Sequence, residues 1–140
     1  MKSLTCVSLV CLTLQLSWVA QAQFPNPKYE TDPQCKQIEL EGMRTSVSGQ
    51  VAETLLIQKA EPVWKHHVPM EARVTGTVVI VYQIGKKGKV LCPRIVSGPK
   101  LLQQPALNGL LRYRYKPYLL GGKPVIVRTE ISIPVTSGEQ

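Results

Sequence analysis

Residues that could carry out chemistry are few in this 140-residue sequence, and they lack the spacing that catalysis or metal binding requires. His66 and His67 are adjacent, so they point in different directions on either a helix or a strand. No cysteine or acidic pair at ligand spacing accompanies them, and we expect no metal site. Asp32 is the only Asp, and no Gly-x-Ser-x-Gly, His-Glu-x-x-His or phosphate-loop motif is present. We therefore predict a protein that is not an enzyme and holds no cofactor.

The first 22 residues have the pattern of an export signal. Lys2 precedes an uncharged stretch rich in Leu and Val, which ends in Ala20-Gln21-Ala22, a small-x-small pattern typical of signal-peptidase cleavage. We predict a signal peptide over 1–22 and a periplasmic chain after its removal. The alternative is an uncleaved segment that holds the chain at the inner membrane. The apolar run is short and interrupted, whereas a membrane span needs about 20 mostly apolar residues.

Cleavage would remove Cys6 and Cys11 and leave Cys35 and Cys92 in an oxidising compartment. A disulfide between these two would close a long loop and stabilise the fold by about 4 kcal/mol on the chain-entropy model. Two free thiols, with Cys92 buried on a strand, fit the sequence equally well. No Cys-x-x-Cys motif is present, so thiol-redox catalysis has no support.

The chain is basic, with 17 Lys and Arg against nine Asp and Glu, a net charge of +8. Basic residues crowd a turn at Lys86, Lys87 and Lys89 and alternate with tyrosines over 112–116. Such interleaving can bind nucleic acid through phosphates and stacking. Because an exported protein meets little nucleic acid, we expect no nucleic-acid partner. A solvated turn and strand face, with a positive field that favours acidic partners, is the preferred interpretation.

The composition changes near Ser48-Gly49. Residues 23–50 are rich in Pro, Ser, Gln and charge, whereas residues 51–140 hold 13 basic and five acidic side chains and most of the large apolar residues. We therefore predict a flexible polar tail over 23–50 and one domain over 51–140.

Alternation of apolar and polar residues predicts the strands of this domain. Val74–Ile84 alternates clearly, Gly85–Lys89 supplies a hairpin turn, and Val90–Ser97 returns as a second strand. The last strand is predicted over Val125–Val135, with Val, Thr and Ile on one face. Pro134 near its end lacks an N–H, which favours an edge position.

Two helices are predicted, one between the second and last of these strands and one before the first. Leu102–Leu111 has an apolar stripe, and His66–Arg73 is a shorter candidate. Val51–Ile57 is a weaker strand candidate, and Arg114–Tyr118 is expected to be extended. This order predicts an α+β fold, a small antiparallel sheet of three to four strands with two helices packed on one face.

Short motifs follow one another in a distinctive order between Glu61 and Val135. In chain order they are Pro62-Val63-Trp64, Arg73-Val74-Thr75-Gly76-Thr77-Val78-Val79, Gly88-Lys89-Val90, Ala106-Leu107, Tyr113-Arg114-Tyr115-Lys116-Pro117 and Gly122-Lys123-Pro124-Val125. Together they resemble the C-terminal domain of TonB, the energy transducer of Gram-negative bacteria. The chain departs from that pattern at Trp64-Lys65, where the family has Tyr-Pro, and at Tyr113, where the family has Trp.

The resemblance implies a binding mechanism. In TonB-like domains the last strand accepts the TonB box, an extended segment of an outer-membrane transporter, as an added strand. The partner-binding residues that it implies here are Val127, Arg128, Thr129, Glu130, Ile131, Ser132 and Ile133, with Pro62 and Trp64 extending the surface. Arg128, Glu130 and Ser132 are the candidates for contact with the partner's side chains.

Other roles stay open on the sequence. The domain could be structural and self-associate through its edge strand as a homodimer, with no energy-transducing role. If it does serve transport, a separate inner-membrane motor would supply the force. Residues 23–50, fully extended at about 3.4 Å per residue, reach only about 95 Å, which we expect to be less than the width of the periplasm.

Overall fold

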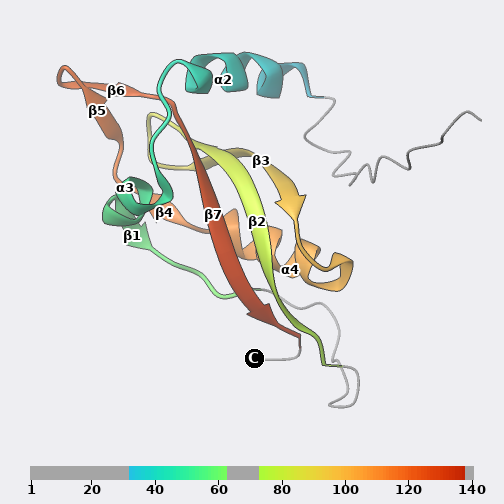
Figure 1. Ribbon diagram of the computed structural model, residues 1–140. Coiled ribbons are helices and arrows are strands. Elements are labelled where there is room, and N and C mark those ends of the chain that lie inside the picture. Colours follow the sequence, from blue (N-terminus) through green and yellow to red (C-terminus); the bar gives the residue numbers. More distant parts are fainter. Residues whose placement is uncertain (1–31, 63–72, 138–140) are drawn as a thin grey trace, which may run out of the picture.

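The computed structural model describes residues 32–62 and 73–137 (Figure 1). Its elements are α2 (Pro33–Met43), α3 (Gly49–Thr54), β1 (Leu56–Gln58), β2 (Thr75–Ile84), β3 (Val90–Ser97), α4 (Lys100–Leu110), β4 (Arg114–Tyr115), β5 (Tyr118–Leu120), β6 (Lys123–Val125) and β7 (Val127–Thr136). The predicted signal over 1–22 and Trp64 lie outside the described residues. Over the two described ranges, no helix has the length and apolar character needed to cross a membrane.

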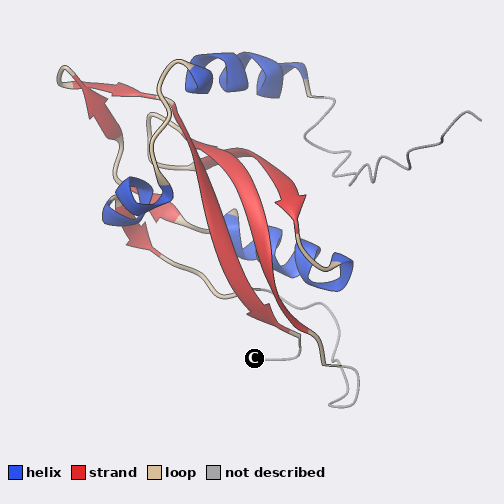
Figure 2. Ribbon diagram, in the orientation of Figure 1, coloured by secondary structure: helices blue, strands red, loops and turns tan. Residues whose placement is uncertain are grey.

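The central strand is β2, in a three-stranded antiparallel sheet of order β3-β2-β7 (Figure 2). Its pairing with β7 is continuous, from Thr75 opposite Thr136 to Ile84 opposite Val127. Two small sheets, β1-β4 and β5-β6, complete the described strands. The predicted alternation is confirmed, because every second residue along most of β2 is fully buried on one face: Val78, Ile80, Tyr82 and Ile84.

Helix α4 covers this buried face and confirms the helix predicted over 102–111. Leu102, Leu107 and Leu110 are fully buried, and burying each leucine contributes about 1.5–3 kcal/mol. Gly109 costs a helix about 1 kcal/mol relative to Ala. A Cβ there would lie 3.1 Å from the carbonyl oxygen of Glu61, so the glycine lets the chain after β1 pass close to α4. The helices and antiparallel sheets confirm the α+β class.

Helix α2 packs against the opposite face of the sheet. Gln83 and Arg128 are cross-strand partners and are out of phase with the buried Tyr82, so they share the face away from α4. Gly42 of α2 lies over them, since a Cβ at this position would be 2.9 Å from Cγ of Gln83. Two helices were predicted on one face. One of them is α4, the second (66–73) lies almost entirely outside the described residues, and α2 was not predicted.

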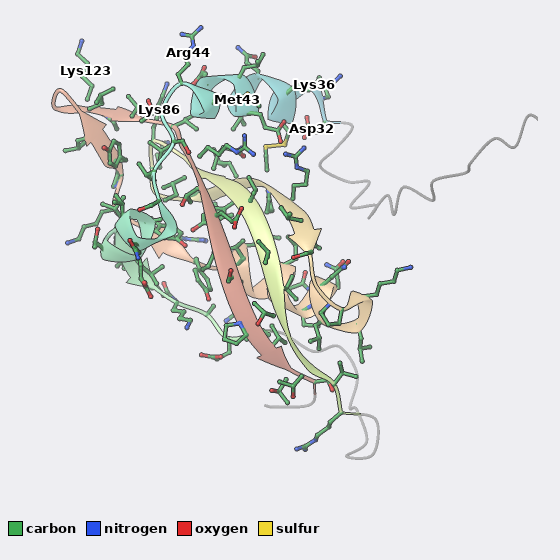
Figure 3. All side chains as sticks on the ribbon, viewed as in Figure 1. Asp32, Lys36, Met43, Arg44, Lys86 and Lys123 are labelled. Carbon is green, nitrogen blue, oxygen red and sulfur yellow. A yellow bond between two sulfur atoms is a disulfide. The ribbon has the colours of Figure 1, made fainter. Side chains whose placement is uncertain are left out.

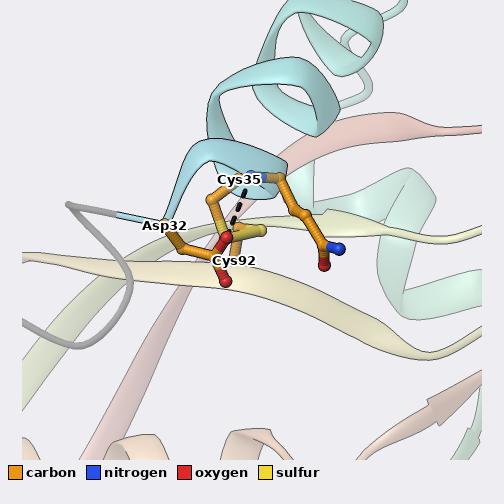
Figure 4. The surroundings of a disulfide bond; sticks show 4 residues. Asp32, Cys35 and Cys92 are labelled. Atoms are coloured by element: carbon orange, nitrogen blue, oxygen red, sulfur yellow. Dashed lines mark hydrogen bonds between the residues drawn. A yellow bond between two sulfur atoms is a disulfide. The ribbon is translucent and has the colours of Figure 1, made fainter.

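A disulfide joins α2 to the sheet. Cys35 is bonded to Cys92 of β3, and both residues are buried (Figure 4). The helix begins at Pro33, and the Asp32 side chain accepts a hydrogen bond from the Gln34 N–H at 2.9 Å. The segment 23–50, expected to be a flexible tail, therefore includes a capped helix that is covalently tied to the domain.

The strand predicted over Val51–Ile57 is wrong in its first half. Residues Gly49–Thr54 form α3, and only Leu56–Gln58 is a strand. Ser48 favours a helix here because it caps the first turn of α3. Its side chain accepts a hydrogen bond from the Val51 N–H at 3.3 Å and so satisfies a backbone donor that has no partner within the helix.

The hairpin between β2 and β3 turns at Gly88, whose φ is +73°. The Tyr115 N–H donates to the Gly88 carbonyl oxygen at 2.9 Å, so the tip of this hairpin is pinned to β4. A Cβ on Gly88 would overlap the Tyr115 carbonyl group, so only glycine fits this position.

Candidate functional site

Strand β7 is an edge strand of the described sheet, since it pairs with β2 alone. The N–H and C=O of Arg128 point away from β2, because both bond to another segment of the chain. Successive residues of an antiparallel strand alternate in this direction, so the backbone groups of Glu130, Ser132, Pro134 and Thr136 point outward as well. Pro134 therefore occupies a position where its missing N–H removes no bond to β2, which agrees with the predicted edge.

The chain itself closes one end of this edge. Val47 donates its N–H to the Arg128 carbonyl oxygen at 2.9 Å, and the Arg128 N–H donates to the Thr45 carbonyl oxygen at 3.0 Å. Gly49 lies against the next outward group, because a Cβ there would be 2.8 Å from the carbonyl oxygen of Glu130. We call the segment Asp32–Gly49 the N-terminal arm. It covers the edge at Arg128 and leaves the edge open beyond Glu130.

The arm is held in place at several points. The Cys35–Cys92 disulfide ties its helix to β3. Lys86, at the β2–β3 turn, reaches Glu41 of α2 with its Nζ 3.8 Å from Oε2 (Figure 3). Both side chains are about half exposed, so this ion pair contributes little, about 0–1 kcal/mol. The disulfide is the principal restraint.

A groove of about 650 Å³ runs beside the open part of β7. On the other side it is bounded by the chain from α3 through β1 to Pro62, which runs alongside β7 in Figure 1. The residues that line it are Ser48, Gly49, Gln50, Glu53, Leu56, Lys59, Glu61, Pro62, Tyr82, Tyr113, Tyr115, Glu130, Ile131, Ser132, Ile133 and Pro134. The groove therefore follows β7 from Glu130 to Pro134 and has both apolar and polar walls.

Three tyrosines form the inner wall of the groove. The hydroxyls of Tyr82 and Tyr115 are 2.6 Å apart and hydrogen bond to each other, and the rings of Tyr113 and Tyr115 have centroids 6.4 Å apart. Burial, with smaller contributions from Tyr115 and Glu61, raises the pKa of Tyr113 to about 12. Burial likewise raises the pKa of Tyr82. All three rings are almost fully buried and stay protonated at neutral pH.

The structure divides the residues implied by the resemblance into two groups. Glu130, Ile131, Ser132, Ile133 and Pro62 line the groove. Val127 and Thr129 are buried in the domain, and Arg128 is covered by the arm. The groove therefore runs along the C-terminal half of the predicted span Val127–Ile133 and continues to Pro134.

Sequence reasoning missed the tyrosines and the acidic residues of the opposite wall. The alternation of β2 places Tyr82 on the α4 face, and Tyr113 and Tyr115 stand two apart on one extended segment. These spacings were visible, but residues 48–62 come beside β7 through tertiary contacts, namely the approach of Gly49 to Glu130 and the pairing of β1 with β4.

No three His, Cys, Asp or Glu side chains among the described residues gather closely enough to hold a metal ion. What the arrangement offers is unpaired backbone beside a groove, a chemistry suited to an extended polypeptide.

Comparison with known proteins supports a family assignment. The family model described as Gram-negative bacterial TonB protein C-terminal matches residues 68–136, a span that includes every strand from β2 to β7. Searches of curated proteins and of solved structures found no match to this chain. The arm lies outside the matched residues. Domains of this family are non-enzymatic parts of energy transducers in the Gram-negative cell envelope. Through residues 68–136, the chain belongs to the TonB C-terminal domain family.

Proposed function

We propose that this chain is a periplasmic binding module that takes up an extended peptide of an outer-membrane transporter as an added strand on β7. Its family supports a role in TonB-like energy transduction for transport. The observation that carries the proposal is the outer edge of β7 beyond Glu130, with which no described strand pairs and which lies beside a groove of about 650 Å³.

The edge offers a defined set of bonds. Beyond Glu130, outward N–H groups belong to Ser132 and Thr136, and outward carbonyls belong to these two residues and to Pro134. Each backbone hydrogen bond contributes about 0.5–1.5 kcal/mol net. Part of this gain is offset by the entropy cost of ordering the peptide, so affinity depends on peptide side chains that enter the groove.

The proposed location follows from the signal over 1–22, with an uncleaved inner-membrane anchor as the alternative. A separate inner-membrane motor is the proposed source of force. Mass spectrometry of the protein purified from periplasm shows whether the exported chain begins at Gln23. A chain that begins there has lost residues 1–22, whereas a chain that keeps them retains the membrane anchor.

Isotope-labelled protein titrated with a peptide of TonB-box type tests the proposal. We expect the amide signals of Ser132 and Thr136 to shift and their hydrogen exchange to slow, while the covered amide of Arg128 changes little. Unchanged signals over Glu130–Thr136 at millimolar peptide would exclude strand addition at this edge.

The same unpaired edge favours a second candidate, a homodimer in which two β7 strands pair antiparallel about a two-fold axis. Light scattering without peptide separates the two. A stable dimer with Ser132 and Thr136 already protected from exchange would favour self-association, whereas a monomer with both amides exposed would favour peptide uptake.

A further inference from the structure

The groove is acidic although the protein is basic. Three of the nine acidic residues of the whole chain line it, namely Glu53, Glu61 and Glu130, against one basic residue, Lys59. All three carboxylates are on exposed residues. Within 32–62 and 73–137, the one ion pair is Glu41–Lys86, so none of the three has a cation within 4.0 Å. Among the described residues, the lining of the groove beside β7 therefore carries an excess of negative charge, in a protein whose net charge is +8.

A second, independent feature points into the same groove. Tyr113 is 1% exposed and lines it. The Tyr82 and Tyr115 hydroxyls satisfy each other, but no described residue forms a hydrogen bond with the Tyr113 hydroxyl. Among the described residues, the buried side-chain atoms that lack a partner are Gln83 Oε1 and Thr129 Oγ1, and the Tyr113 hydroxyl is not one of them. Since Tyr113 lines the groove, its hydroxyl can act as a hydrogen-bond donor to a peptide there.

We propose that the peptide taken up at β7 carries a Lys or Arg side chain, which enters the groove among Glu53, Glu61 and Glu130, while the Tyr113 hydroxyl donates to a carbonyl or polar group of the peptide. This rests on the proposed function, because β7 holds the peptide backbone. The negative charge of the groove residues favours a peptide with a positively charged side chain. An acidic segment would be attracted to the basic protein as a whole but repelled where it must dock.

The expected preference is moderate. The carboxylates are exposed, and ion pairs at exposed sites are weak and screened by salt. We expect a peptide with one Lys to bind about 5- to 20-fold more tightly than the same peptide with Glu, and the ratio to fall between 50 and 200 mM salt.

The test uses the full chain and a capped nine-residue peptide of alternating Thr and Val, with a guest residue moved through the four central positions. The guests are Lys, norleucine and Glu, and calorimetry gives each affinity. Glu53→Gln, Glu61→Gln and Glu130→Gln should each reduce the Lys-to-Glu ratio, and Tyr113→Phe should weaken all peptides alike. Glu41→Gln changes the net charge equally but lies on α2, so it should leave the ratio unchanged.

The outcomes separate this inference from the function on which it rests. Equal affinity for Lys and Glu peptides, with slowed exchange at Ser132 and Thr136 for both, would overturn the charge preference and leave strand addition standing. A Lys preference that Glu41→Gln reduces as much as the groove variants do would also overturn it, because the whole protein would then be the cause. Absence of binding by every peptide would overturn both proposals.

Discussion

The carbonyl oxygen of Arg128 accepts a hydrogen bond from the N–H of Val47 at 2.9 Å, across the outer edge of β7. The N-terminal arm thus occupies the first outward position of the strand on which a partner is proposed to dock. An incoming strand can pair only beyond Glu130. The arm lies outside residues 68–136, which the family model matches.

Replacing Cys35 by Ser is expected to lower the free energy of unfolding by about 2–5 kcal/mol under oxidising conditions. The bond ties the arm to β3, so its loss should also speed hydrogen exchange at the Arg128 amide. Chemical denaturation and NMR exchange measure the two effects. In excess reductant the wild type and the variant should be equally stable. A difference that persists there would mean that Cys35 acts through packing.

Ser132→Pro is expected to weaken peptide binding about 3- to 10-fold by removing one outward N–H. The melting temperature should change little, because that N–H makes no bond to β2. Ser132→Ala is the matched control, since it removes the side-chain hydroxyl but keeps the N–H, so the difference between the Pro and Ala variants reports the lost N–H. Calorimetry with one peptide compares all three proteins. Equal affinity for the Pro and Ala variants would place the docking edge elsewhere.

Gly88→Ala is expected to destabilise the fold by more than about 2 kcal/mol. The position has φ +73°, and the added Cβ would overlap the Tyr115 carbonyl group. Gly121→Ala has the same conformational cost at φ +57°, but no atom lies within 4 Å of the added Cβ, so we expect a loss of about 1–2 kcal/mol. The free energies of unfolding of both variants are measured in urea, and their difference gives the cost of the overlap with the Tyr115 carbonyl group. Similar losses would show that β4 moves aside freely.

Tyr82→Phe and Tyr115→Phe are each expected to cost about 1–3 kcal/mol, because each leaves the partner hydroxyl buried and unsatisfied. The double variant should cost less than the sum, with a coupling of at least about 0.5 kcal/mol. Tyr113→Phe should change stability little, since its hydroxyl bonds to no described residue. Strict additivity in the double-mutant cycle would contradict the hydrogen bond between the two hydroxyls.

Much of the sheet could be predicted because its strands alternate strongly. The odd–even pattern of Val74–Ile84 and of Val125–Val135 predicted two strands with one buried face, and the structure has β2 and β7 there with that face under α4. Pro134 predicted an edge for a physical reason, the missing donor, and it stands at an outward position of β7.

The arm and the groove could not be predicted in the same way. Helix α2 is mostly polar and only weakly amphipathic, so its sequence has no periodic apolar pattern that would predict a packed helix. Asp32-Pro33 is a sequence typical of the start of a helix, but the polar composition of residues 23–50 favoured a flexible tail. Cysteine spacing does not determine pairing. The groove depends on bringing residues 48–62 beside β7, a relationship between distant segments that no local pattern contains.

The other side of the sheet ends in β3, where Pro93 removes a donor and Cys92, at φ +45°, bends the strand. With the arm lying over one end of β7 and Pro134 near the other, neither flank presents a long uninterrupted row of donors. These interruptions oppose the edge-to-edge stacking of copies into an open-ended fibril. A short stretch of β7 beyond Glu130 stays accessible to one added strand, while the interrupted edges on both sides of the sheet disfavour aggregation.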